Sequence, residues 1–232
     1  MGRTVKSWQG APLHLWRPLQ IAHAMPTKLF RPIGLHELAL LWDSGMRKFP
    51  QRLVHQPIFY PVVNVDYARQ IAREWNTPDA NSGFAGFVTR FDVSSTYLSK
   101  FDLHTAGSAA HREYWIPARE LNSFNKAITG LISVEEAFFG DKFVGYIPDD
   151  HRLKGQNAVG QFAELSKMVD HAEFKSEVSV NRKAVFLNCL FWLKTDLSSL
   201  GCSREQREAF ITKLVKTWGS NNIAVPLPIW LK

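Results

Sequence analysis

The order of strands and helices expected between residues 28 and 140 constrains the fold of this chain more than any other feature. Residues 28–33 have the pattern of a strand, and residues 34–44 follow with leucines at helical spacing. An aromatic strand over residues 57–61 and a helix over residues 65–75 repeat this order. The strands that come next are not joined by long crossover helices, which favours a mixed α+β fold over a doubly wound parallel sheet.

Three further strands and a helical turn complete this part of the chain. Strands are expected over residues 86–93, 97–104 and 111–116, and a short helical turn over residues 118–124. The first of these strands alternates its side chains in the way that is typical of a strand with a buried apolar face. We therefore treat residues 28–140 as one domain.

The chain on either side of this domain has a different composition. Residues 1–27 mix Gly, Pro, His and Trp without a sustained period, so we expect an N-terminal arm with one short strand over residues 14–19. Residues 141–232 are expected to form a helical accessory region, because apolar side chains recur there at helical spacing. The expected elements of this region are helices over residues 155–170, 181–194 and 204–218 and an extended tail over residues 223–231 that packs back.

The composition excludes several classes of protein. With 45% hydrophobic and 21% charged residues, the chain is neither collagen-like nor a highly charged disordered protein. Two cysteines without zinc or thioredoxin spacing fit a reducing compartment. No secretory signal is visible, and the most apolar segment, residues 184–193, is too short to span a bilayer. We expect a soluble, cytoplasmic protein with no membrane partner.

The net charge is the main indication of the partners of this chain. A formal charge of +7 favours anionic partners. The basic side chains of residues 141–232 are spread over several expected helices, and their simplest interpretation is a solvated surface. If they serve target recognition instead, they raise DNA or RNA among the candidate partners, beside a protein target. No metal site is expected, because Asp149 and Asp150 follow a proline and are typical of a helix entry. The oligomeric state stays open.

The residues around Glu113 carry the clearest chemical signal. Glu113 lies in an aromatic strand, where an ionised carboxylate is costly unless it is paired or faces a cleft. The simpler interpretation is an outward-facing residue paired with Arg112 or Arg119. The sequence has no GxGxxG, Walker A, HExxH or GxSxG motif, which disfavours dinucleotide-fold oxidoreductases, P-loop NTPases, zincins and α/β-hydrolases.

Four segments together resemble the ADP-ribosyltransferase fold. They are Leu29-Phe-Arg-Pro, the Gly-Leu-His-Glu-Leu helix that ends in Ser44-Gly45, Ile58-Phe-Tyr-Pro with the Tyr67-Ala68 helix, and Glu113-Tyr-Trp-Ile-Pro. The similarity is to bacterial proteins labelled "ADP-ribosylation/crystallin J1", and it covers residues 28–140. It implies a split β-sandwich of the ADP-ribosyltransferase type, followed by a mainly helical C-terminal part.

The resemblance also implies an activity, the transfer of ADP-ribose from NAD to a nucleic acid or protein, as in a toxin, an effector or a nucleic-acid modifier. By motif order, the three functional positions of the family fall on Arg31, Tyr60 (or Phe59) and Glu113. Glu113 would be the catalytic carboxylate that stabilises the oxocarbenium-like ribose. Arg31 would bind the pyrophosphate or fix the ribose, and Tyr60 would stack on nicotinamide. Phe59 and Tyr67 are further candidates for NAD binding.

Two residues depart from the pattern of the family. Pro32 stands beside Arg31 and has no N–H to offer to the nicotinamide amide. His111 stands two residues before Glu113, where arginine-modifying members have Glu or Gln, so His111 is a candidate for positioning a different acceptor. Pro32 favours the alternative function, a non-catalytic member that binds a nucleotide, a nucleic acid or a protein. A third hypothesis, NAD-dependent removal of an RNA 2′-phosphate, lacks the paired Arg and His set.

Overall fold

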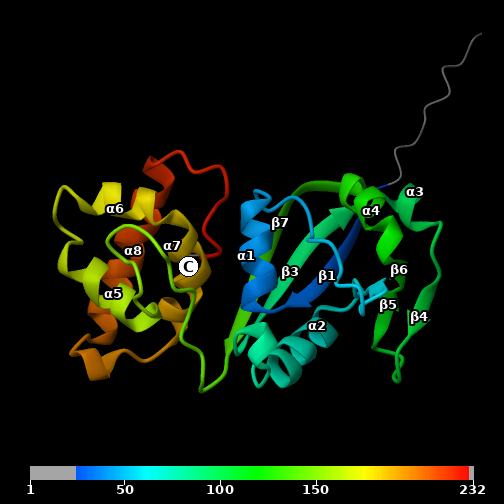
Figure 1. The fold of residues 1–232 in the computed structure, drawn as a ribbon, viewed down its shortest axis with the longest axis horizontal. Helices are drawn as coiled ribbons and strands as arrows, with labels where there is room; N and C mark the ends of the chain where they lie inside the picture. Colours follow the sequence, from blue (N-terminus) through cyan, green and yellow to red (C-terminus); the bar gives the residue numbers. More distant parts are fainter. Residues whose placement is uncertain (1–24, 230–232) are drawn as a thin grey trace, which may run out of the picture.

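The computed structural model describes residues 25–229, which form a β-rich part and a helical part side by side (Figure 1). Helix α1 (Leu35–Asp43) lies between the two parts. The protein is therefore an α+β protein with a helical C-terminal part, as the sequence predicts. The strand expected over residues 14–19 and nearly all of the expected N-terminal arm lie outside the described residues.

The main sheet has three antiparallel strands in the order β1, β3, β7. These strands are β1 (Thr27–Ile33), β3 (Ala85–Val93) and β7 (Ile128–Phe139). The central strand, β3, is buried along most of its length on both faces. In β1, Leu29, Arg31 and Ile33 are buried on one face, while Phe30 and Pro32 point to the other, because side chains alternate along a strand.

Four short strands lie beyond the free edge of β1. They are β2 (Ile58–Phe59), β4 (Leu103–Thr105), β5 (Arg112–Tyr114) and β6 (Ile116–Pro117). Strand β2 pairs with β6, and β4 pairs with β5. Val62 links these pairs to the main sheet, since it forms one bridge with Phe30 of β1 and another with Glu113 of β5. Phe30, Val62 and Glu113 thus lie in one row across the strands.

Different helices cover the two faces of the main sheet. Helix α1 packs on the face that carries Leu29 and Ile33. Helix α2 (Val65–Ile71) packs on the opposite face, where Phe30 and Val88 lie. Asparagine favours the start of a helix, and the Asn64 side chain caps α2 by accepting a hydrogen bond from its backbone.

The helical part packs around one buried helix. Its helices are α5 (Ala158–Lys167), α6 (Phe174–Val180), α7 (Arg182–Lys194) and α8 (Arg204–Ser220). Nearly every side chain of α7 from Ala184 to Trp192 is buried. The ring of Phe186 lies 4.6 Å from the ring of Trp42 in α1, so one continuous core joins the helices to the sheet. The expected tail packs back within the described residues, since Trp218 donates to the Val225 carbonyl at 2.9 Å.

The structure corrects three expectations. Residues 97–104 are not a single strand, because Ser94 caps the short helix α3 (Ser95–Leu98) and only β4 is extended. The strand expected over residues 111–116 is interrupted at Trp115, which separates β5 from β6. Helix α6 has no counterpart among the expected elements, since seven residues are too few to establish a helical period.

A close approach between β3 and the end of α2 requires glycine at position 86. Helix α2 continues as a π-helical turn, Ala72–Asn76, that crosses β3. A Cβ atom at Gly86 would lie 2.0 Å from the Ala72 carbonyl oxygen, a contact with backbone that no side-chain rotation relieves. The absence of a side chain at position 86 therefore allows the π-helical turn to pack this closely on the sheet.

We predict that Gly86→Ala lowers the free energy of unfolding by about 3 kcal/mol, because the sheet and the π-helical turn must move apart. The matched control is Gly160→Ala in α5, where the nearest atom to the new Cβ is the side-chain oxygen of Gln156 at 3.4 Å. This control should raise stability by about 0.5–1 kcal/mol through helix propensity. Urea unfolding of both variants measures the difference, and equal stabilities would contradict the close approach.

Candidate functional site

Arg31 is held at the end of β1 by a carboxylate from the next helix. Only Gly34 separates β1 from α1, so Glu37 in the first turn of α1 returns to Arg31. Nε and Nη2 of Arg31 donate to the two carboxylate oxygens of Glu37 at 3.0 and 3.3 Å. The guanidinium also lies 4.4 Å from the centre of the Phe59 ring, and its Nη1 donates to the Tyr60 backbone carbonyl at 3.3 Å. These contacts hold the guanidinium in one orientation.

Arg52 brings a second guanidinium to the same carboxylate. It lies in the connection between α1 and β2, and its Nη1 is 3.9 Å from Glu37 Oε2. Its Nε is buried and has no hydrogen-bond partner among residues 25–229. Burial lowers the pKa of Arg52, and the charge of Arg31 lowers it further. Two cations therefore meet one carboxylate, which leaves an excess of positive charge and a free donor.

These side chains line a cavity of about 580 Å³, a volume typical of small-molecule sites. It lies between the end of β1, the start of α1, residues 50–56 and the end of α2. The guanidinium groups are deep in it, with side-chain exposures of 9% for Arg31 and 12% for Arg52. Leu40, Leu53 and Trp75 line its entrance and are more than half exposed. We call this space the Arg31–Arg52 cavity; it has a cationic base and an apolar entrance.

One wall of the Arg31–Arg52 cavity is a polar network around Asp79. Ser82 Oγ donates to Asp79 Oδ2 at 2.8 Å, and the backbone N–H of Asn81 donates to Oδ1 at 3.1 Å. Asn76 Nδ2 donates in turn to Ser82 Oγ at 3.1 Å. The hydrogen bond from Ser82 is the main reason that the pKa of Asp79 is lowered, so Asp79 is ionised at neutral pH.

Glu113 lies in a different group of side chains, which we call the Glu113 cluster: Tyr60, Tyr67, His104, His111, Glu113 and Trp115. The indole N–H of Trp115 donates to Glu113 Oε1 at 2.9 Å. His104 is the cross-strand partner of Glu113, and its ring stacks on Trp115 with centroids 4.3 Å apart. The ring of Tyr60 meets Trp115 edge-on at 6.2 Å. The carboxylate is thus buried among aromatic rings.

Tyr67 and His111 form the other side of the Glu113 cluster. Their rings stack with centroids 4.1 Å apart. Burial raises the pKa of Tyr67, and the charge of Glu113 adds to this shift. His111 is half-buried, and its Nδ1 lies 3.2 Å from the Ala106 carbonyl. The structure thus brings together four of the residues singled out by sequence: Tyr60, Tyr67, His111 and Glu113.

The strand register separates these residues from Arg31. Phe30, Val62 and Glu113 are paired in one row, so their side chains point to the α2 side of the strands. Arg31 is the next residue after Phe30 and points to the α1 side. It lines the Arg31–Arg52 cavity, whereas Glu113 does not. Of the expected set, Arg31 and Glu113 therefore lie in two different places, and Tyr60 contacts both groups: its carbonyl accepts from Arg31 and its ring packs against Trp115.

Phe59 is a correction to the expected NAD-binding residues. Its side chain is fully buried and packs on Phe49 and Phe124, with ring centroids 4.9 and 5.2 Å away. It therefore supports the site from within the core and has no surface to offer to a ligand. Its contact with the Arg31 guanidinium is its link to the cavity.

Several residues of the cavity escaped the sequence analysis. Glu37 stands in the Gly-Leu-His-Glu-Leu segment, and the one-residue connection from strand to helix is a signal that could have identified its partner. Arg52, Trp75 and Asp79 come from a loop, from the π-helical turn and from the loop after it. No hydrophobic period or motif marks such positions, so only the fold brings them together.

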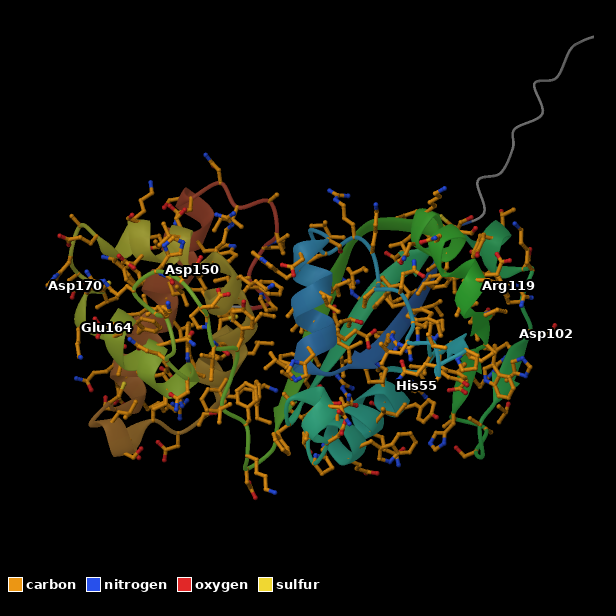
Figure 2. All side chains as sticks on the ribbon, in the orientation of Figure 1. His55, Asp102, Arg119, Asp150, Glu164 and Asp170 are labelled. Carbon is orange, nitrogen blue, oxygen red and sulfur yellow. The ribbon has the colours of Figure 1, made fainter. Side chains whose placement is uncertain are left out.

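The basic character expected for residues 141–232 needs a correction. They contain thirteen Lys and Arg against ten Asp and Glu, so their excess charge is small. Many of these cations are also paired: Arg152 and Lys167 with Glu164, Lys213 with Asp170, and Lys183 with Asp43. Glu164 and Asp170 lie on the helical part together with Asp150 (Figure 2). This surface therefore gives no particular support to nucleic-acid binding.

Two kinds of feature are absent from the described part of the chain. Residues 25–229 hold no group of three or more His, Cys, Asp or Glu side chains arranged to bind a metal ion. Within the same residues, no helix is long and apolar enough to cross a membrane. Comparisons of the chain with models of protein families, with curated proteins and with solved structures found no match.

We predict that Glu37→Gln lowers the free energy of unfolding by about 2 kcal/mol, because Arg31 and Arg52 would then lie buried without a counter-charge. The control is Glu208→Gln, which breaks the exposed pair with Arg204 and should leave the thermal midpoint unchanged. Thermal unfolding measures both. An equal midpoint for the two variants would show that Glu37 does not neutralise the guanidinium groups.

Proposed function

We propose that this protein binds a phosphate-bearing nucleotide, NAD or a fragment of it, in the Arg31–Arg52 cavity, as a non-catalytic member of the ADP-ribosyltransferase-like proteins. The observation that carries the proposal is the pair of buried guanidinium groups that share one carboxylate, with Arg52 Nε left without a partner among residues 25–229. A phosphate would supply both the missing acceptor and the missing negative charge.

The entrance of the cavity supports a nucleotide over a simple anion. Trp75 lines it with 59% of its surface exposed, beside the exposed aliphatic side chains of Leu40 and Leu53. A flat base can stack on an exposed indole and bury this apolar surface. The start of α1 adds the positive end of a helix next to Arg31, since no side chain among the described residues caps it. The cavity therefore offers contacts for the phosphate and for the base.

The finer fold assignment is part of the same proposal. We infer an ADP-ribosyltransferase-like split β-sandwich in residues 28–140 from the order of the three motifs along the chain and from the two antiparallel groups of strands that meet at Val62. The non-catalytic function is supported by the strand register, which points Arg31 and Glu113 to opposite sides.

Titration calorimetry with NAD and with ADP-ribose tests this function. We predict that wild-type protein binds both and that Arg52→Gln weakens binding at least about tenfold, because a buried charge-assisted contact to phosphate is lost. Arg119→Gln is the matched control, since Arg119 is exposed in the 3-10 turn Ala118–Glu120, just before α4 (Leu121–Ala127) and outside the cavity lining (Figure 2). Absence of binding at about 1 mM ligand would contradict the proposal.

A second candidate function is ADP-ribosyl transfer at Glu113, which the Glu113 cluster favours. Trp115 fixes one carboxylate oxygen, and no side chain within residues 25–229 donates to the other. In the reaction, the bond between ribose C1′ and nicotinamide breaks and its electron pair leaves with nicotinamide. The acceptor then bonds to C1′ and loses a proton. A carboxylate beside the ribose would stabilise the positive charge in between.

Release of nicotinamide from NAD tests this second function. If transfer occurs at Glu113, Glu113→Gln abolishes the release, whereas Glu120→Gln, a carboxylate outside the Glu113 cluster, leaves it unchanged. If the protein is non-catalytic, as we propose, neither wild type nor the variants release nicotinamide above the uncatalysed rate. Chromatographic detection of free nicotinamide, with and without added nucleic acid or protein, separates these outcomes.

A further inference from the structure

The Arg31–Arg52 cavity contains an ionised carboxylate that the binding of phosphate does not use. Asp79 lines the same cavity as the two guanidinium groups, on the wall formed by the loop after the π-helical turn. The Asp79 side chain caps the 3-10 turn Ala80–Ser82 by accepting from the Asn81 backbone. Because a fixed negative charge beside a bound anion is unfavourable, its place in this cavity calls for a further role. A carboxylate next to a nucleotide can accept hydrogen bonds from the ribose hydroxyls.

The hydrogen bonds of Asp79 leave room for such a contact. Oδ1 accepts from the backbone N–H of Asn81 at 3.1 Å and from its side-chain amide at 3.3 Å. Among the side chains of the described residues, only Ser82 Oγ donates to Oδ2, at 2.8 Å. The Ser82 backbone N–H donates to the backbone carbonyl of Asp79 at 3.2 Å. Each carboxylate oxygen has two lone pairs, so one acceptor position on Oδ2 stays open. The three bonds also fix the orientation of the carboxylate, which would otherwise rotate freely.

Asp79 lines the cavity together with the residues where we place the base. Trp75, where we place the base, and Asn76 come from the turn just before Asp79 in the chain, and all three line the cavity. The wall behind Asp79 is also rigid, because a Cβ at Gly34 would lie only 2.5 Å from the Ser82 Cα atom. The carboxylate is therefore held at a fixed place in the wall of the cavity.

We propose that Asp79 recognises a free ribose hydroxyl, so that the cavity selects ribonucleotides with an unmodified 2′,3′-diol and rejects both 2′-deoxy and 2′-phosphorylated nucleotides. This inference rests on the proposed nucleotide binding. A deoxyribose leaves the open acceptor position of Asp79 unused. A 2′-phosphate places a second negative charge against the ionised carboxylate, which is the larger effect. Asp79 is thus a specificity-determining residue of the cavity.

Calorimetric titration of wild-type protein with paired ligands tests this inference: NAD against NADP, and AMP against 2′-deoxy-AMP. We expect NADP to bind at least about tenfold more weakly than NAD, and 2′-deoxy-AMP to bind several-fold more weakly than AMP. Equal affinities within each pair would overturn the role of Asp79 while leaving the proposed nucleotide binding intact. Failure of all four ligands to bind would overturn both.

Two variants locate the effect at Asp79. Asp79→Asn and Asp79→Ser remove the charge, and both keep an oxygen that accepts from the Asn81 backbone, so the loop should still fold. In both, the preference for NAD over NADP should fall to within about twofold. In Asp79→Ser, AMP and 2′-deoxy-AMP should also bind equally, because the single hydroxyl oxygen that caps the loop leaves no second acceptor for the ribose. A preference that persists in both variants would overturn the assignment. Circular dichroism spectra verify that the variants are folded.

Discussion

The ion pair between Arg31 and Glu37 is the contact on which the arrangement of this protein depends. It joins the end of strand β1 to the first turn of helix α1, across a connection of a single glycine. The other end of α1 carries Trp42 and Asp43, which contact Phe186 and Lys183 of the helical part. One helix is thus fixed to the sheet at its start and to the helical part at its end, so the cavity and the common core share this element.

The alternation of side chains along β1 has the largest consequence for function. Arg31 enters the basic cavity because its neighbour Phe30 lies in the row that leads through Val62 to Glu113. The same alternation that buries Arg31 beside α1 directs Glu113 toward α2 and its aromatic neighbours. Arg31 and Glu113, which the resemblance assigns to one site, therefore face different surroundings. This separation supports a binding function at the cavity over a reaction shared between the two residues.

The sequence predicts the parts of the fold that have a strong local signal. Strands β1 and β3, helices α1, α2, α5, α7 and α8, and the tail that packs back all follow from hydrophobic period and from residues such as Asn64 at helix starts. Trp115 interrupts an expected strand, and its indole N–H donates to the Glu113 carboxylate. No local sequence pattern predicts this contact.

The candidate site was harder to predict than the fold, for a physical reason. Arg31, Tyr67, His111 and Glu113 stand on regular elements, and a motif order could identify them. Arg52 and Asp79 stand on loops, and their importance arises from burial and from long-range contacts with Glu37 and Ser82. The resemblance to ADP-ribosyltransferases drew attention to Arg31, but it gave no sign that the strand register would separate Arg31 from Glu113.

The most direct test of the account is to find which side chains a nucleotide touches. Nuclear magnetic resonance of nitrogen-15-labelled protein resolves the indole N–H signals of tryptophan and the Nε–H signals of arginine. On addition of ADP-ribose, the account predicts that the signals of Trp75 and Arg52 shift, while that of Trp115 stays in place. A shift of Trp115 with Trp75 and Arg52 unchanged would place the ligand at the Glu113 cluster and contradict the account.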